Sequence, residues 1–326
     1  MHRIIVTGLL IICSGIHAQV HTAINESEIS RIEKTLAADD MMGRKVFTSG
    51  IEKAASFIIQ EFKVAGLQPL PGSNDFKQTF TFADPDSMVA TIEPDGHVVD
   101  KKNLTNLVGL IPGKSKPDEY VIFSAHYDHL GVGQPDAMGD SIYNGANDDA
   151  SGTTAVIALA NYFSKLRNNE RTVIFAAFTA EEAGEIGSAY FSNKIDPAKI
   201  IAMFNIEMIG TESKWGKNSA YITGFDKSDI GTILQRNLKN SQFKFYPDPY
   251  PEQMLFLRSD NATLAKRGVP AHSISTSKMD SEKLYHQRGD EVETLDLQNM
   301  TEIIRAIGLS AGSIIAGKDT PYRVKH

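Results

Sequence analysis

Five short segments, far apart in this chain, each place a residue of a metal-binding type at the end of an expected strand or in a loop. They are His126 in SAHYDH, Asp148 in GANDDASG, Glu182 in TAEEAGEIGS, Glu207 in NIEMIG and His286 in YHQRGDE. Imidazole and carboxylate together form a ligand set that suits zinc. Two histidines and three carboxylates are too many for one tetrahedral zinc ion, but they fit two zinc ions that share a carboxylate. A site of this kind activates water and stabilises a tetrahedral intermediate.

Three neighbouring side chains suit the same chemistry. Glu181 precedes Glu182, and two adjacent carboxylates after an apolar strand are costly unless one binds a cation and the other carries a proton at some stage. We assign Glu182 to the metal and Glu181 to the role of general base. Asp128 lies two residues after His126 and could accept a hydrogen bond from the imidazole nitrogen that does not bind metal. The phenol of Tyr285 could donate to a developing oxyanion.

Each of these short patterns also has an ordinary structural interpretation when it is taken alone. In GANDDASG, Asp148 could bridge two metal ions, while Asp149 could cap the helix that follows, because short polar side chains accept hydrogen bonds there. A polar strand end, a solvated acidic pair or a salt bridge would explain the other segments. The joint occurrence of all five indicates a metal centre. The remaining histidines considered, His97, His129, His272 and His326, lack comparable neighbours, and we expect them at the surface or next to the ligands.

The elements expected around these residues are strands, loops and helices in alternation. Apolar runs predict strands at 120–125, 172–178, 200–206 and 270–275, and weaker alternation predicts edge strands at 76–82, 88–92 and 98–99. Helical spacing predicts helices at 28–38, at 52–62, directly after GANDDASG and at 297–315. This order predicts a three-layer α/β/α fold with a central mixed, mostly parallel sheet. The four upstream candidate ligands then lie at strand ends, where open α/β sheets bind their ligands.

The composition narrows the function classes. The chain has 326 residues, of which 41% are hydrophobic, and this is enough for a sizeable core. The net charge of −7 shows no basic excess, so we expect no nucleic-acid partner. No linker of the kind that separates domains is apparent, and residues 19–326 are expected to form a single domain. The oligomeric state is not indicated by the sequence.

The first 18 residues have the pattern of a secretory signal peptide. His2 and Arg3 precede an apolar run at 4–12, and Ala18 is a small residue at the expected cleavage point. The run is too short for a stable membrane-spanning helix, so we expect export to the periplasm or the outside of the cell without stable membrane insertion. Cys13 is the only cysteine, so the mature chain would lack thiol chemistry. Lipid attachment at Cys13 is a weaker alternative, because the bulky Ile12 precedes it.

Read together, these segments resemble the co-catalytic zinc aminopeptidases, which include secreted bacterial leucyl aminopeptidases and are related to glutamate carboxypeptidase and glutaminyl cyclase. The resemblance runs from about Asp39 to near the C-terminus, with GANDDASG and AEEAGEIGS as its specific motifs and MMGRK, FLRSDN and KRGVPA in support. It implies two zinc ions per chain. The roles it implies are terminal ligands at His126 and Glu207, a bridge at Asp148, further ligands at Glu182 and His286, the base at Glu181, an oxyanion or substrate contact at Tyr285, and a supporting carboxylate at Asp128.

The resemblance also implies a cis peptide bond between Asp148 and Asp149. The sequence departs from the family pattern at two positions. Glu207 stands where the family often has aspartate, and Asn261 follows Asp260 where the family often has histidine.

The function that this resemblance implies is a secreted dizinc aminopeptidase acting on peptides with a free N-terminus. A carboxypeptidase or dipeptidase is an alternative, but such relatives carry a large inserted domain, for which 69–103 is too short. Single-zinc glutaminyl cyclases lack part of the ligand set, whereas all five positions are present here. A binding protein on an inactive peptidase fold should have lost ligands or the base, and this chain has lost neither.

Overall fold

The computed structural model describes residues 24–82, 102–278 and 282–324. The expected signal peptide, the expected strands at 88–92 and 98–99, and the residues His97 and His326 lie outside these ranges. In the part of the chain that is described, no helix combines the length and apolar character needed to cross a membrane.

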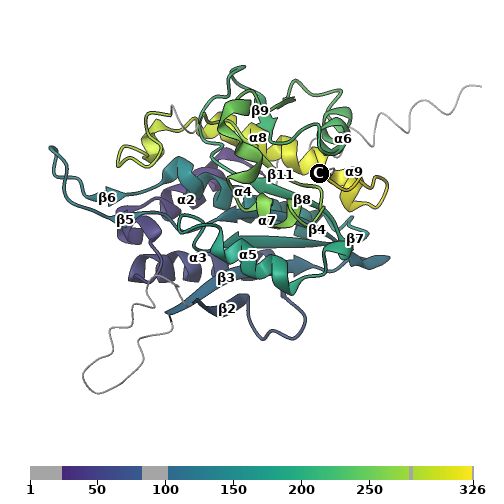
Figure 1. The fold of residues 1–326 in the computed structure, drawn as a ribbon, viewed down its shortest axis with the longest axis horizontal. Helices are drawn as coiled ribbons and strands as arrows, with labels where there is room; N and C mark the ends of the chain where they lie inside the picture. The colour runs from purple at the N-terminus through teal and green to yellow at the C-terminus, as the bar shows by residue number, and fades with distance from the viewer. Residues whose placement is uncertain (1–23, 83–101, 279–281, 325–326) are drawn as a thin grey trace, which may run out of the picture.

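One mixed sheet forms the centre of the fold (Figure 1). Its strands are β1 (Gln68–Pro69), β2 (Lys77–Phe82), β3 (Lys102–Ile111), β4 (Lys116–His126), β7 (Arg171–Phe178), β8 (Ile200–Ile206), β9 (Ser219–Ile222), β10 (Lys244–Pro247) and β11 (Ala271–Ser275). They are ordered β1-β3-β7-β4-β8-β11-β9-β10, and β2 pairs with β3. The four central strands β7, β4, β8 and β11 run parallel, whereas β3 is antiparallel to β7 and β9 to β11. The predicted mixed, mostly parallel sheet is therefore confirmed.

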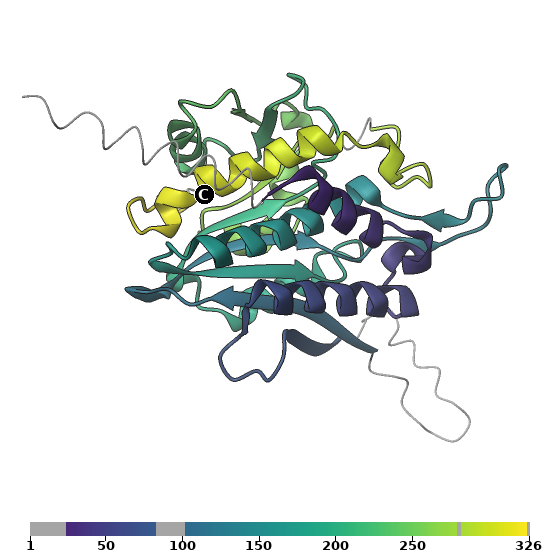
Figure 2. The same ribbon diagram turned by 180° about the vertical axis from the view of Figure 1, so that it is seen from behind.

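Helices cover both faces of this sheet. One face carries α2 (Glu26–Leu36), α3 (Ser49–Ala65), α4 (Ser151–Leu166) and α8 (Leu297–Ser310), as Figure 2 shows. The other face carries α5 (Ile186–Lys194) and α7 (Asn261–Ala265) (Figure 1). Alternate residues of β4 enter different cores: Val121 and Phe123 pack with the first set of helices, and Ile122 with the second. The three-layer α/β/α architecture follows from this alternation.

Most predicted elements are present, with shifted ends. The strand expected at 200–206 has those bounds, and the strands expected at 120–125 and 172–178 lie inside β4 and β7. The helix expected at 52–62 extends over Ser49–Ala65 and ends at Gly66, whose φ of 74° is left-handed. The single helix expected at 297–315 is wrong: α8 ends at Ser310 and α9 (Gly312–Ile315) begins after Ala311, with glycine, a poor helix former, as its first residue.

Smaller elements lie beside the carboxyl ends of the central strands. A two-stranded hairpin of β5 (Gly131–Val132) and β6 (Ile142–Tyr143) follows β4 and leads into a helical turn at Ala146–Ala150. A second turn at Asp39–Arg44 connects α2 to α3 and contacts both hairpin strands. Helix α6 (Ile230–Asn237) packs on α8.

Candidate metal centre

The predicted ligands meet at the carboxyl edge of the central parallel strands. His126 is the last residue of β4, and Glu207 directly follows β8. Glu182 lies four residues after the end of β7, and Asp148 lies in the turn that enters α4. His286 is reached through the loop after β11. Because parallel strands end at the same side of a sheet, segments up to 160 residues apart in the chain converge there.

The first group of possible ligands consists of His126, Asp148 and Glu207. Nε2 of His126 lies 3.2 Å from Oδ1 of Asp148 and 3.4 Å from Oε1 of Glu207. All three residues are buried, and their ligand atoms are close enough together to bind one ion. Ligand atoms that lie 2.0–2.1 Å from a tetrahedral zinc ion are about 3.3–3.4 Å apart. The spacing of this group therefore fits zinc.

The second group uses the other oxygen of Asp148. Nε2 of His286 lies 3.3 Å from Oδ2 of Asp148 and 3.0 Å from Oε2 of Glu182. Oδ2 of Asp148 and Nε2 of His286 are buried, and neither has a hydrogen-bond partner among the described residues. Buried polar atoms without partners are rare in folded proteins, and a bound cation would satisfy both. Asp148 thus presents one oxygen to each group, which fits the predicted bridge.

The charges of the site also call for a cation. Burial opposes a charge on Asp148, but His126 and His286 hold the pKa of this carboxyl well below its usual range. Burial likewise opposes a charge on His286, yet Asp148 and Glu182 raise its pKa to about 10. Without a metal, the imidazoles would therefore have to carry protons to balance the carboxylates. Metal ions would replace that charge, because metal ligation requires neutral imidazole.

Glu181 lies at the edge of this cluster. Its Oε2 is 4.0 Å from Nε2 of His126, and its side chain is 15% exposed. Burial raises the pKa of Glu181 well above its ordinary value, and repulsion from Glu207 and Asp260 adds to the effect, while His126 opposes it. Its place at the rim of the site, beside the ligands but outside both groups, is the position required of a general base.

Asp128 has a different contact from the one that its spacing predicts. Its carboxylate Oδ1 is 3.9 Å from Nδ1 of His126, whereas its own backbone carbonyl is 3.1 Å from that nitrogen. The carboxylate instead accepts a hydrogen bond of 3.1 Å from the backbone N–H of Glu181. The chain turns after β4 so that the carbonyl faces the imidazole and the carboxylate faces the loop after β7. The carboxylate of Asp128 therefore positions Glu181, while the backbone carbonyl of the same residue meets the ring of His126.

Asp149 ties three of the ligand-bearing segments together. Its Oδ1 accepts hydrogen bonds from the N–H groups of Gly152 and Met208, and its Oδ2 accepts from that of His126. The bond to Gly152 satisfies an N–H group in the first turn of α4, as predicted for Asp149, although the residue directly before this helix is Ala150. The peptide bond between Asp148 and Asp149 is cis, as the family resemblance implies. One buried carboxylate thus fixes the ends of β4 and β8 relative to α4.

Two further buried residues hold the loop before Asp148. Asp290 accepts hydrogen bonds from the N–H groups of Asn147 and Asp148, at 2.8 and 3.0 Å. Arg44, from the MMGRK segment, is fully buried. Its guanidinium donates to four backbone carbonyls, those of Leu36, Tyr127, Asn144 and Gly145. Tyr127 directly follows His126, and Gly145 lies three residues before Asp148, so Arg44 joins the N-terminal region to the metal loops.

Tyr285 packs directly on the second group. Its ring stacks on that of His286 with 3.9 Å between centroids, and it also packs on an apolar cluster of Met208, Tyr221 and Leu255. Burial raises the pKa of Tyr285, and the nearby carboxylates raise it further. The phenol therefore keeps its proton and remains a hydrogen-bond donor, as the predicted oxyanion role requires.

Two of the histidines expected at the surface or next to the ligands are buried. His129 is 2% exposed, and its Nδ1 lies 2.7 Å from Oε1 of Glu182, directly beside the second group. His272 is also buried, where Nδ1 donates to the carbonyl of Thr223 and Nε2 accepts from Ser228. His129 therefore lies next to the ligands, which is one of the two positions expected for it, whereas a surface position is wrong for His272. The only sequence signal for His129 is its place in the same short loop as His126.

The departure at Asn261 has a structural explanation. This buried side chain donates to the carbonyls of Phe256 and Ala271, and its Oδ1 accepts from the hydroxyl of Ser273. It therefore fastens α7 to β11. Glu207, the other departure, accepts a hydrogen bond of 2.6 Å from Ser259 through Oε2, which leaves Oε1 facing His126.

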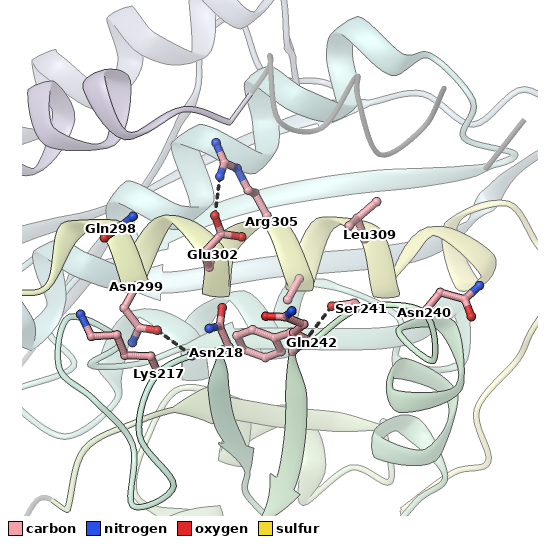
Figure 3. A pocket seen from close by; sticks show the side chains of 12 residues that line it. Lys217, Asn218, Asn240, Ser241, Gln242, Gln298, Asn299, Glu302, Arg305 and Leu309 are labelled. Atoms are coloured by element: carbon pink, nitrogen blue, oxygen red, sulfur yellow. Dashed lines mark hydrogen bonds and ion pairs between the residues drawn. The ribbon is translucent and has the colours of Figure 1, made fainter. Parts of the chain in front are cut away.

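A separate cavity of about 550 Å³ lies along α8 (Figure 3). Residues before β9, after α6 and on α8 line it, and Figure 3 shows the polar side chains of Lys217, Asn299 and Glu302 there. None of the candidate metal ligands lines this cavity. The catalytic chemistry indicated by the sequence therefore belongs to the carboxyl edge of the sheet.

The mixed sheet and the two ligand groups at its edge together define a metallopeptidase-like α/β protein. The chain belongs to Peptidase family M28, whose family model matches residues 106–310, well over half of its length. All five candidate ligands lie within the matched range.

Curated relatives and solved structures agree with this family. A "Probable zinc metalloprotease" of Pyrenophora tritici-repentis is 34% identical over 33% of this chain and 25% of its own length. "Leucine aminopeptidase 2" of Trichophyton rubrum is 24% identical over 87% of this chain and 61% of its own length. The chain thus spans less than two thirds of the length of these relatives.

Two solved structures have the same fold. The zinc aminopeptidase BSAP of Bacillus subtilis has a TM-score of 0.68 at 14% identity, over 91% of this chain and 97% of its own. A glutaminyl cyclase of Bacteroides thetaiotaomicron has a TM-score of 0.64 at 15% identity, over 91% of this chain and 99% of its own. Because one fold includes both activities, the function has to be argued from the site.

Proposed function

We propose that this protein is an aminopeptidase that binds two zinc ions and releases N-terminal residues from peptides. The observation that carries the proposal is the position of Asp148. Oδ1 of Asp148 lies at ligand spacing from His126, and His126 lies at ligand spacing from Glu207. Oδ2 lies at ligand spacing from His286, and His286 lies at ligand spacing from Glu182. This arrangement suits two ions that share one carboxylate.

In this proposal His126, Asp148 and Glu207 hold one zinc ion, and His286, Asp148 and Glu182 hold the other. Zinc supplies Lewis acidity, which activates water and polarises the scissile carbonyl. Glu181 accepts a proton from the attacking water and passes it to the leaving amine. The phenol of Tyr285 donates a hydrogen bond to the oxygen of the attacked carbonyl.

The surroundings of the site favour a peptide with a free amine. Glu181 and Glu207 supply acidic groups that would attract an ammonium group. We also propose a preference for an apolar first residue, and the support for it is the name of one relative, a leucine aminopeptidase.

The alternatives are less well supported. A glutaminyl cyclase shares the fold, but a single-zinc cyclase would not need both ligand groups. A carboxypeptidase or dipeptidase would have to bind the carboxylate end of its substrate, and the described residues around the ligands are mainly acidic. A binding protein without activity would have no need of Glu181 beside complete ligand groups.

Glu181→Gln tests the assignment of the base. This variant should keep the zinc content of the wild type and lose about 10²- to 10⁴-fold in turnover of a peptide substrate, the usual contribution of general-base catalysis. Glu185→Gln is a matched control from the same loop, because Glu185 belongs to neither ligand group. Turnover close to that of the wild type in Glu181→Gln, with zinc bound, would remove Glu181 from the mechanism.

We also propose that the protein is exported after removal of residues 1–18. The observation behind this is the charged, apolar and small-residue order of the N-terminus. Mass spectrometry of the protein isolated from expressing cells tests it. A mature chain that begins at Gln19 is expected, and an intact Met1 in the secreted fraction would contradict cleavage.

A further inference from the structure

Among the described residues of the site, His129 is the one buried imidazole to which the five-ligand scheme gives no role. It lies beside the second ligand group. It follows β4 by three residues, and its backbone N–H donates to the carbonyl of Arg44. Its Nδ1 faces Oε1 of Glu182 at 2.7 Å and is 3.9 Å from Oδ2 of Asp148. His129 could therefore be either an additional metal ligand or a hydrogen-bond partner of Glu182.

The distances separate these two roles. Neighbouring ligands of a tetrahedral zinc ion are about 3.3–3.4 Å apart. The contacts of His126 and His286 to the carboxylates of their groups lie between 3.0 and 3.4 Å. The contact from His129 to Glu182 is 2.7 Å, which is the length of a charge-assisted hydrogen bond. His286 meets Oε2 of Glu182, whereas His129 meets Oε1, so the two imidazoles use different oxygens of one carboxylate.

The second nitrogen of His129 supports the same choice. Nε2 is buried and has no hydrogen-bond partner among the described residues. If Nδ1 bound a metal, Nε2 would have to carry the proton, which would leave a buried N–H without an acceptor, an arrangement that folded proteins avoid. If Nδ1 carries the proton and donates to Glu182, Nδ1 has its acceptor and Nε2 is left as an acceptor without a donor, so no buried N–H of the ring lacks a partner.

The packing around the ring fixes its orientation. A Cβ atom on Gly145 would lie 2.5 Å from Cδ2 and 2.6 Å from Cγ of His129, so the backbone of the Asp148 loop presses on one face of the imidazole. The ring of His286 lies edge-on to it, with 5.8 Å between centroids. His129 is therefore held between the two loops that supply the second group.

We propose that His129 is a positioning residue: its Nδ1 donates to Oε1 of Glu182 and so directs Oε2 of that carboxylate to zinc. Partners of this kind orient a ligand and limit its movement, and their loss costs about 10- to 100-fold in metal affinity. The inference rests on the proposed two-zinc site and adds to it a residue outside the ligand set.

A pair of isosteric variants tests this role. His129→Asn places an amide nitrogen where the imidazole has Nδ1, and His129→Leu has nearly the same shape as asparagine without the donor. The full chain is loaded with zinc, and the affinity of each ion is measured by competition with a chromogenic chelator. The visible spectrum of the cobalt-substituted protein reports the geometry of the ligands separately from activity.

His129→Leu should bind one of the two zinc ions about 10- to 100-fold more weakly than the wild type, with an altered cobalt spectrum. His129→Asn should remain close to the wild type in both measurements. His272→Leu is the matched control for loss of a buried histidine, and it should keep both zinc affinities even if it lowers thermal stability.

Two results would overturn the inference. Unchanged zinc affinity in a folded His129→Leu would show that the hydrogen bond does not position Glu182. An equal loss in His129→Asn and His129→Leu would show that His129 binds the metal itself. The proposed site fails separately if the wild type binds fewer than two zinc ions, because that result is obtained before any variant is compared.

Discussion

Replacement of Arg44 by lysine should destabilise the protein strongly, although it conserves the charge. Arg44 is fully buried, and its guanidinium donates to the carbonyls of Leu36, Tyr127, Asn144 and Gly145 at distances between 2.6 and 3.0 Å. The four acceptors come from three separate segments of chain. The planar guanidinium group of arginine can donate to all four at once, whereas the ammonium group of lysine has three N–H donors on a single nitrogen atom.

The size of the effect follows from the carbonyls that lose their donor. An ammonium group in this position would satisfy about two of the four, because they approach three different guanidinium nitrogens. Each buried acceptor left without a partner costs about 1–3 kcal/mol, so two of them cost about 2–6 kcal/mol of the free energy of unfolding. This is a large part of the roughly 5–15 kcal/mol that stabilises a typical domain.

Urea denaturation of Arg44→Lys and of the wild type, both saturated with zinc, measures this difference. Arg236→Lys is the matched control, because Arg236 forms one ion pair with Asp319 from an exposed position, and such a pair should be worth at most about 1 kcal/mol. If Arg44→Lys lost no more stability than Arg236→Lys, with the same dependence on urea, the carbonyls would have other partners and the reasoning would be wrong.

Two further predictions concern the loop and the pH dependence. Gly145→Ala should weaken zinc binding and lower the melting temperature. Gly145 has a φ of +55°, and a Cβ atom there would lie 2.2 Å from the carbonyl oxygen of Asp148. An unchanged zinc affinity would contradict this prediction. Burial raises the pKa of Glu33 to about 8 from 4.5, although a hydrogen bond from Thr154 opposes the shift. Because the native state keeps this proton, Glu33 contributes fully to the free energy of unfolding at a pH below its unfolded pKa. This contribution is lost as the pH rises through about 8. In denaturation curves from pH 4.5 to 8, Glu33→Gln should therefore lose less stability than the wild type, and parallel profiles would refute the assignment.

The central strands could be predicted because their residues are almost all apolar. β7 and β8 are buried on both faces, and continuous apolar runs signal such strands directly. β3 was not predicted: it contains the buried Asn106, whose side chain donates to the carbonyl of Gly187 and accepts from the N–H of Thr179. Its partners are more than 70 residues away, so its own sequence gives only a weak strand signal.

The candidate ligands could be predicted because their residue types and strand-end positions agree with one another. The hydrogen bonds that hold them could not be predicted in the same way. Whether the carbonyl or the carboxylate of Asp128 faces His126 depends on how the chain turns after β4. The contact between His129 and Glu182 joins residues 53 positions apart, and no local pattern indicates it. Tertiary packing determines both contacts.

The most direct test of the proposed aminopeptidase is the release of free amino acids from a panel of peptides, each offered with a free and with an acetylated N-terminus. The zinc-loaded protein should release residues from the front of the unblocked peptides, with apolar first residues preferred, and acetylation should abolish the release. Release from the C-terminus regardless of acetylation would contradict the proposal and indicate a carboxypeptidase. No release from any peptide by protein that holds zinc would also contradict it, and would leave a cyclase or a binding role.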